Sequence, residues 1–83
     1  MSRTDLQSLI VDVMSDPART FTERQVADRL NVSTDTVGRL RRATVPDPAS
    51  GMPPLTGWVI VGRKHQLPAP TLAAYIANLP VVA

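Results

Sequence analysis

Hydrophobic residues recur at helical spacing near the start of the chain. The apolar positions of this stretch are Leu6, Leu9, Ile10 and Val13. Thr4, followed three residues later by Gln7, has the pattern of a capping box, and Asp16-Pro17 stops the run. The pattern predicts a helix over about residues 5–15.

A second helix is predicted over about residues 22–30. Thr22 and Gln25 form a stronger capping-box pattern, and Phe21 stands where it can pack on Val26. The apolar residues that share one face of this helix are Val26, Ala27 and Leu30. The helical period breaks at Asn31, and asparagine tolerates the left-handed conformation that often ends a helix.

A third helix is predicted from its cap, Ser33, to about residue 43, with Val37 and Leu40 facing inward and Pro46 marking the stop. At 100° per residue, the outward stripe is Asp35, Gly38, Arg39 and Arg42, bordered by Thr34, Thr36 and Arg41. Two helices separated by a three-residue turn, with the small Ala27 at their crossing, have the spacing of a helix-turn-helix.

The rest of the chain predicts a loop, a hairpin and a last helix. Residues 44–57 hold four of the eight prolines and two of the four glycines, so a connecting loop is expected, ordered by Met52 and Leu55. A hairpin follows over residues 58–67, with Gly62-Arg63-Lys64 as its turn and His65-Gln66-Leu67 as its return strand. A helix over residues 69–79 is expected from the stripe Leu72, Ile76 and Leu79, with Pro80 ending it. The predicted fold is therefore mainly α with a small β-hairpin, in a single domain of residues 1–83.

Composition excludes several classes of protein. The chain has no cysteine and one histidine, which excludes disulfides and any thiolate or multi-histidine metal site. Acidic residues interrupt the apolar N-terminal run, which we interpret as a helix of a cytoplasmic protein and not as a signal peptide. Seven acids, a lone His65 and no phosphate-binding glycine motif leave no convergent catalytic site. We therefore expect that the protein is not an enzyme, that it binds no cofactor or small-molecule ligand, and that it does not associate with membranes.

Charge is distributed unevenly along the chain. Residues 1–35 carry four arginines and six acids, whereas residues 36–83 carry five basic residues and one acid, Asp47. The outward stripe of the third helix suits a major groove, since arginine can bond guanine O6 and N7. The predicted DNA-binding residues of this helix are Ser33, Thr34, Thr36, Gly38, Arg39, Arg41 and Arg42. The alternative is that its arginines only complement the negative end of the helix dipole.

Two further basic sites are predicted beside this helix. Arg63, Lys64 and His65, at the hairpin tip, suit a phosphate backbone or a minor groove, although a solvated turn that protects an edge strand would have the same residues. Thr22 and Arg24, at the start of the second helix, are expected to contact phosphate. Trp58 and Tyr75 lie among aliphatic residues, and we interpret them as core residues and not as stacking platforms.

The stretch FTERQVADRLNVS, residues 21–33, resembles the opening of small excisionase-type domains with the winged-helix fold of MerR-type regulators. Thr36, Val37 and Arg39 match the continuation of that pattern, and residues 66–68 and 72–76 resemble the wing exit and last helix. The resemblance covers about residues 21–79. It departs from the family in Asn31, where a glycine is usual, in His65, where tryptophan is common, and in a longer loop at residues 44–57.

The resemblance implies DNA binding by the third helix in a major groove, with the hairpin as a wing. Phage members of the family are recombination directionality factors, which bend attachment-site DNA and help a tyrosine integrase excise a prophage in a bacterial cell. A module of this size is expected to work in multiples on neighbouring sites. The alternatives are a small regulator of a phage or mobile element and a protein-interaction adaptor that uses the proline-rich loop and residues 79–82.

Overall fold

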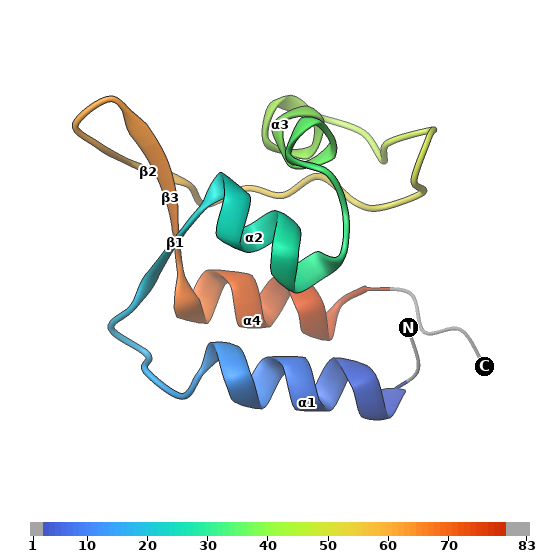
Figure 1. Cartoon of the computed structure of the whole chain (residues 1–83). Helices are drawn as coiled ribbons and strands as arrows, with labels where there is room; N and C mark the ends of the chain where they lie inside the picture. Colours follow the sequence, from blue (N-terminus) through green and yellow to red (C-terminus); the bar gives the residue numbers. More distant parts are fainter. Residues whose placement is uncertain (1–2, 80–83) are drawn as a thin grey trace.

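The computed structural model describes residues 3–79, which form four helices and a three-stranded antiparallel sheet (Figure 1). The elements in chain order are α1 (Arg3–Val13), β1 (Thr20–Thr22), α2 (Glu23–Leu30), α3 (Thr34–Arg42), β2 (Val59–Val61), β3 (Lys64–Pro68) and α4 (Ala69–Ala77). The predicted class, mainly α with a small hairpin, is confirmed. Within this part of the chain, no helix combines the length and the apolar character needed to cross a bilayer.

α1 and α4 lie antiparallel to each other on one side of the molecule (Figure 1). Leu6 and Val13 of α1 and Leu72 and Ile76 of α4 are all buried, so each helix covers the apolar stripe of the other. Residues of α1 are helical from Arg3 onward. The predicted Thr4 cap is therefore wrong, because that residue already lies inside the helix.

α1 also ends two residues earlier than predicted. The Ser15 side chain and backbone N–H both bond to the Asp12 carbonyl, at 2.8 and 3.3 Å, and this turn closes the helix before residue 15. α4 ends at Ala77 instead of residue 79, with Asn78 as its C-cap, although Leu79 is buried as the predicted stripe required. The predicted stop at Pro80 lies outside the described residues.

The limits of α2 and α3 follow from their caps, as predicted. The Thr22 hydroxyl accepts from Gln25 N at 3.2 Å, and the Gln25 side chain accepts from Thr22 N at 3.0 Å. Asn31 ends α2 in the left-handed conformation, with φ 57° and ψ 44°. Ser33 caps α3 by accepting from Thr36 N at 3.1 Å. The three-residue connection thus holds the two helices at a defined angle.

The sheet has one strand more than the predicted hairpin. β3 is central in the order β1-β3-β2, and Phe21 of β1 pairs with Leu67 of β3. Both side chains are fully buried, so the added strand places an aromatic ring in the core. The turn is also tighter than predicted, since Val61 pairs with Lys64 and only Gly62 and Arg63 lie between them. Gly62 has φ 65°, which a two-residue hairpin turn requires.

The loop over residues 44–57 has no regular structure but is fixed to the body, as predicted. Leu55 is fully buried, and its N–H donates to the Leu40 carbonyl of α3 at 3.0 Å. Trp58 and Tyr75, half-buried against the core, donate to the carbonyls of Leu55 and Pro53 at 2.9 and 2.7 Å. Their interpretation as packing residues fits these contacts, and the loop reaches β2 along a defined path.

Candidate functional site

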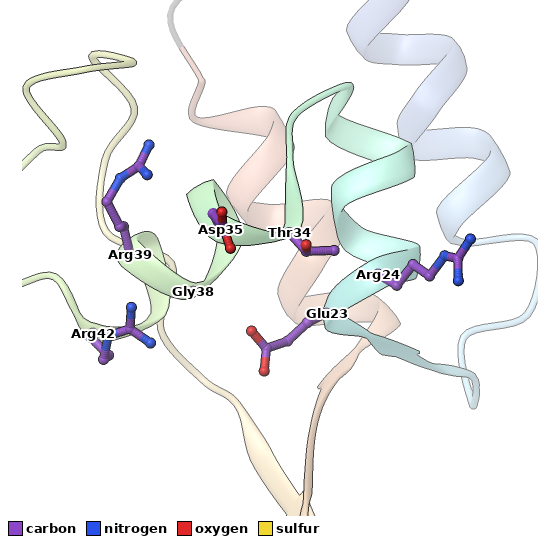
Figure 2. Close-up of a pocket in the computed structure, with 7 residues that line it drawn as sticks. All are labelled: Glu23, Arg24, Thr34, Asp35, Gly38, Arg39 and Arg42. Carbon is purple, nitrogen blue, oxygen red and sulfur yellow. The ribbon is translucent and has the colours of Figure 1, made fainter.

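The outward side of α3 borders an open groove of about 670 Å³ (Figure 2). Its lining residues come from α3 and from the first turn of α2, and they are Glu23, Arg24, Thr34, Asp35, Gly38, Arg39 and Arg42. All four residues of the predicted outward stripe line this groove; Asp35, Arg39 and Arg42 are exposed as predicted, whereas Gly38 is buried. Arg39 and Arg42 leave successive turns of α3, and both reach the groove from the same helix (Figure 2).

Two residues predicted on this face lie differently. Thr36 was predicted at the border of the stripe, but it is only 9% exposed. Its hydroxyl lies between Ser33 and Arg39, and it therefore cannot reach a base. Gly38 lines the groove but is covered, since an added Cβ would stand 3.3 Å from Arg42 Nη1. Ser33 is exposed, yet its hydroxyl caps the helix. Thr34, Asp35, Arg39 and Arg42 are therefore the residues of α3 that a large ligand could reach first.

A second depression connects the start of α2 with the hairpin tip. It is lined by Thr22, Glu23, Arg24, Arg63, Lys64 and His65. The two depressions share Glu23 and Arg24, so together they form one continuous surface, which we call the basic surface. It carries five arginine and lysine side chains and two carboxylates, a formal charge of +3 that exceeds the +2 of the whole chain. Positive charge is thus concentrated on this side of the molecule.

Arg41 lies between α3, α2 and the hairpin. Its Nε is 3.6 Å from Glu23 Oε1, and its Nη1 is 3.3 Å from His65 Nε2. His65 Nδ1 is in turn 4.0 Å from the same Glu23 oxygen. All three side chains are roughly one-quarter to one-third exposed, so two of the predicted DNA contacts, Arg41 and His65, join elements of the fold in this structure. Glu23 was not among the predicted site residues; its only signal in the sequence was an acidic side chain in the first turn of a helix, where it suits the helix dipole.

Arg39 forms an ion pair with the loop that follows α3. Its Nε lies 3.4 Å from Asp47 Oδ1, while Nη2 donates to Thr36 Oγ1 at 3.1 Å. Asp47 is only 7% exposed although it carries charge. Sequence reasoning did not assign Asp47 to the site. One feature of the sequence could have pointed to Asp47: it is the only acidic residue among residues 36–83.

The Asp47 carboxylate is held in its ionised form. Its Oδ2 accepts from the Ser50 hydroxyl at 2.8 Å and from Ser50 N at 3.0 Å. The hydroxyl hydrogen bond is the largest effect that lowers the pKa of Asp47 below 3.8; burial opposes it, and the Ser50 backbone and Arg39 add to it. A negative charge therefore stands beside Arg39 at neutral pH.

The basic surface has the properties of a binding surface for a large anion. It offers several guanidinium and ammonium donors, from α3, α2 and the hairpin tip, on an open face. Among residues 3–79, no group of three His, Cys, Asp or Glu side chains is placed to hold a metal ion. Comparisons with protein-family models, curated proteins and solved structures found no match.

Proposed function

We propose that the protein is a sequence-specific, non-catalytic binder of double-stranded DNA, with α2 and α3 as a helix-turn-helix and the β2–β3 hairpin as a wing. The observation that carries this proposal is the continuity of the basic surface from α3 across the start of α2 to the hairpin tip. Regularly spaced phosphates are the polyanion that such an extended cationic face fits, because each neutralised phosphate releases counterions.

In this arrangement α3 lies in the major groove. Arg39 and Arg42 leave the helix on its exposed side, one turn apart, and Thr34 stands at its N-terminal end. A guanidinium can bond guanine O6 and N7 together, so these arginines supply sequence discrimination. Because Thr36 is buried, it makes no base contact of its own, and its hydroxyl contacts Arg39 instead.

The start of α2 and the hairpin supply contacts that do not depend on sequence. Arg24, Arg63 and Lys64 are exposed cations on the basic surface. Lys64 stands at the first position of β3, directly after the two-residue turn, so its ammonium group lies close to the hairpin tip. Such side chains bind phosphate and fix the orientation of the protein on the duplex.

The resemblance to excisionase-type domains narrows the proposed role to a recombination directionality factor in a bacterial cell. Several copies would bind and bend an attachment site so that a tyrosine integrase excises a prophage. Bending a short site costs on the order of 1 to 6 kcal/mol, which binding contacts must offset. A small regulator of a phage or mobile element would use the same surface, so it stands as the alternative role.

Selection from random duplexes, followed by titration, tests DNA binding. Arg39→Ala should weaken binding to the selected site by about 1 to 3 kcal/mol. Lys64→Ala should weaken binding to all duplexes alike and reduce the salt slope by about 1. Arg3→Ala is the matched control, because Arg3 is exposed on α1 and outside the basic surface. Unchanged titrations for both test variants would refute DNA binding by this surface.

An excision assay separates the two proposed roles. A recombination directionality factor should bend its site in circular-permutation gels and stimulate excision by the tyrosine integrase that acts on that attachment site. A plain regulator would occupy separate sites independently on straight DNA and leave excision unchanged. Variants at Arg39 and Lys64 should lose both activities in proportion to their loss of DNA affinity.

A further inference from the structure

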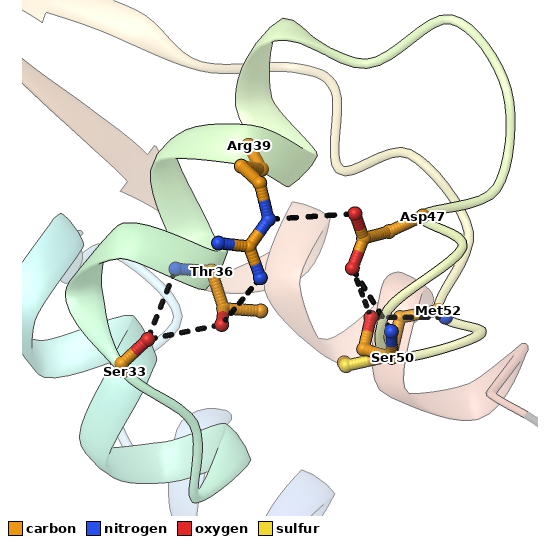
Figure 3. Close-up of polar contacts among 6 residues, drawn as sticks. All are labelled: Ser33, Thr36, Arg39, Asp47, Ser50 and Met52. Atoms are coloured by element: carbon orange, nitrogen blue, oxygen red, sulfur yellow. Dashed lines mark hydrogen bonds and ion pairs between the residues drawn. The ribbon is translucent and has the colours of Figure 1, made fainter.

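The Arg39 guanidinium is held from two sides before any ligand is present. Thr36 Oγ1 accepts from Nη2 at 3.1 Å, and Asp47 Oδ1 lies 3.4 Å from Nε (Figure 3). The two contacts come from different elements, one from α3 itself and one from the loop after it. The arginine side chain is nevertheless 46% exposed. Two of its nitrogens are therefore engaged, while almost half of the side chain stays exposed.

Asp47 is a rigid partner in this contact. Its second carboxylate oxygen accepts from the side chain and backbone of Ser50, at 2.8 and 3.0 Å (Figure 3). Its own backbone is fixed as well, since Asp47 N donates to the Met52 carbonyl at 2.9 Å and Gly51 N donates to the Asp47 carbonyl at 2.7 Å. The loop thus holds the carboxylate at one place and leaves Oδ1 for Arg39.

The contacts leave a defined set of donors on Arg39. A guanidinium has five N–H donors, one on Nε and two on each terminal nitrogen. Asp47 faces Nε, and Thr36 occupies one donor of Nη2. Both donors of Nη1 and one of Nη2 remain. Two terminal nitrogens that donate side by side match guanine O6 and N7 in the major groove.

We propose that Asp47 is a positioning residue for sequence recognition, which with Thr36 holds Arg39 so that its two terminal nitrogens face a guanine. The proposal rests on the DNA-binding function proposed above. A fixed guanidinium loses less freedom on binding than a mobile one. The same carboxylate also repels DNA phosphates. Asp47 therefore lowers the affinity for DNA of any sequence and increases the preference for the selected site.

This role gives Asp47→Asn opposite effects on two kinds of DNA. On the selected site, we expect binding to weaken about 5- to 30-fold, as the guanine contact loses its fixed geometry. On a scrambled duplex, binding should stay equal or become tighter, because a negative charge is removed beside the DNA. Replacing the contacted guanine should then cost the variant less than it costs the wild type. Equal weakening on both duplexes, or no weakening on the selected site, would overturn the proposal.

A double-mutant comparison separates positioning from general damage to the fold. In an Arg39→Ala background, Asp47→Asn should cause no further loss on the selected site, because the residue that it positions is absent. Additive losses would refute the positioning role while leaving the DNA-binding proposal intact. A wild-type protein that binds no duplex would refute both.

Thr36→Val provides a second variant that leaves the loop unchanged. It keeps the shape of the buried side chain but removes the acceptor of Arg39 Nη2. It should also weaken binding to the selected site more than to the scrambled duplex. A thermal melt of each variant establishes that it is folded at the assay temperature, and equal effects of Thr36→Val on both duplexes would count against the proposal.

Discussion

Glu23 and Arg41 form an ion pair that joins the first turn of α2 to the last turn of α3, with 3.6 Å between Glu23 Oε1 and Arg41 Nε. The same carboxylate lines both depressions of the basic surface. It therefore restrains one cation and adds a negative charge where we propose that DNA binds. His65 completes the cluster from the hairpin.

Glu23→Gln should increase affinity for any duplex. The change removes a repulsive charge and releases Arg41 for a phosphate, so the slope of log K against log salt should steepen by about 0.9 for one added contact. The loss of a partly exposed ion pair should lower the free energy of unfolding by less than about 1 kcal/mol. Asp28→Asn is the control, since Asp28 is exposed on α2 outside both depressions. An unchanged slope for Glu23→Gln would contradict the release of Arg41.

The loop over residues 44–57 should contribute to stability through one buried side chain. Leu55→Ala is expected to lower the free energy of unfolding by about 2 to 5 kcal/mol, because Leu55 is fully buried. Val45→Ala, in the same loop but at a position 65% exposed, should change it by less than about 0.5 kcal/mol. Denaturant titrations followed by circular dichroism measure both. Similar values for the two variants would mean that the loop does not pack on the core in solution.

Asn31 should be replaceable by glycine but not by alanine. Its φ of 57° costs a residue with a Cβ about 1 to 2 kcal/mol, and asparagine tolerates this conformation better than alanine does. Asn31→Ala should therefore destabilise the protein by about 1 kcal/mol, whereas Asn31→Gly should not destabilise it, because glycine has no Cβ. Thermal melts compare the two. Equal melting temperatures would argue against a left-handed residue at this turn.

Tyr75 should titrate late, because burial raises its pKa from 10.0 to about 12. The raised value means that the folded state keeps the phenolic proton longer than the unfolded state does. The corresponding stability is complete below pH 10 and is lost as the pH rises toward about 12. Tyr75 is the only tyrosine, so phenolate absorbance reports it directly. The midpoint should return to about 10 in denaturant, and a folded protein with the same midpoint would contradict this burial.

Local signals predicted much of the structure. The Thr22–Gln25 capping box, Asn31 and the Ser33 cap indicated the limits of α2 and α3, because a cap satisfies backbone groups within a few residues of itself. Hydrophobic spacing identified the buried face of α3 through Val37 and Leu40, and the outward stripe followed from the same geometry. The proline-rich composition of residues 44–57 likewise indicated a loop.

Local sequence signals could not predict contacts between residues that are far apart in the chain. β1 has three residues, too few for a period, and it exists because Phe21 pairs with Leu67 46 residues later in the chain. Asp47 was visible as a lone acid, but its pairing with Arg39 depends on the fold of the loop. The helical pattern placed Arg41 at the border of the outward stripe as a predicted DNA contact, whereas tertiary contacts bring Glu23 and His65 to it.

The sequence by itself determined where the helices lie, the caps of α2 and α3 and the side of α3 that faces outward, because neighbouring residues decide these features. Only the tertiary structure decided which cations remain available. Burial of Thr36 and the positions of Asp47 and Glu23 depend on how α2, α3, the loop and the hairpin pack together. A side chain's charge is a property of the sequence, but its partner is chosen by proximity, which packing alone provides.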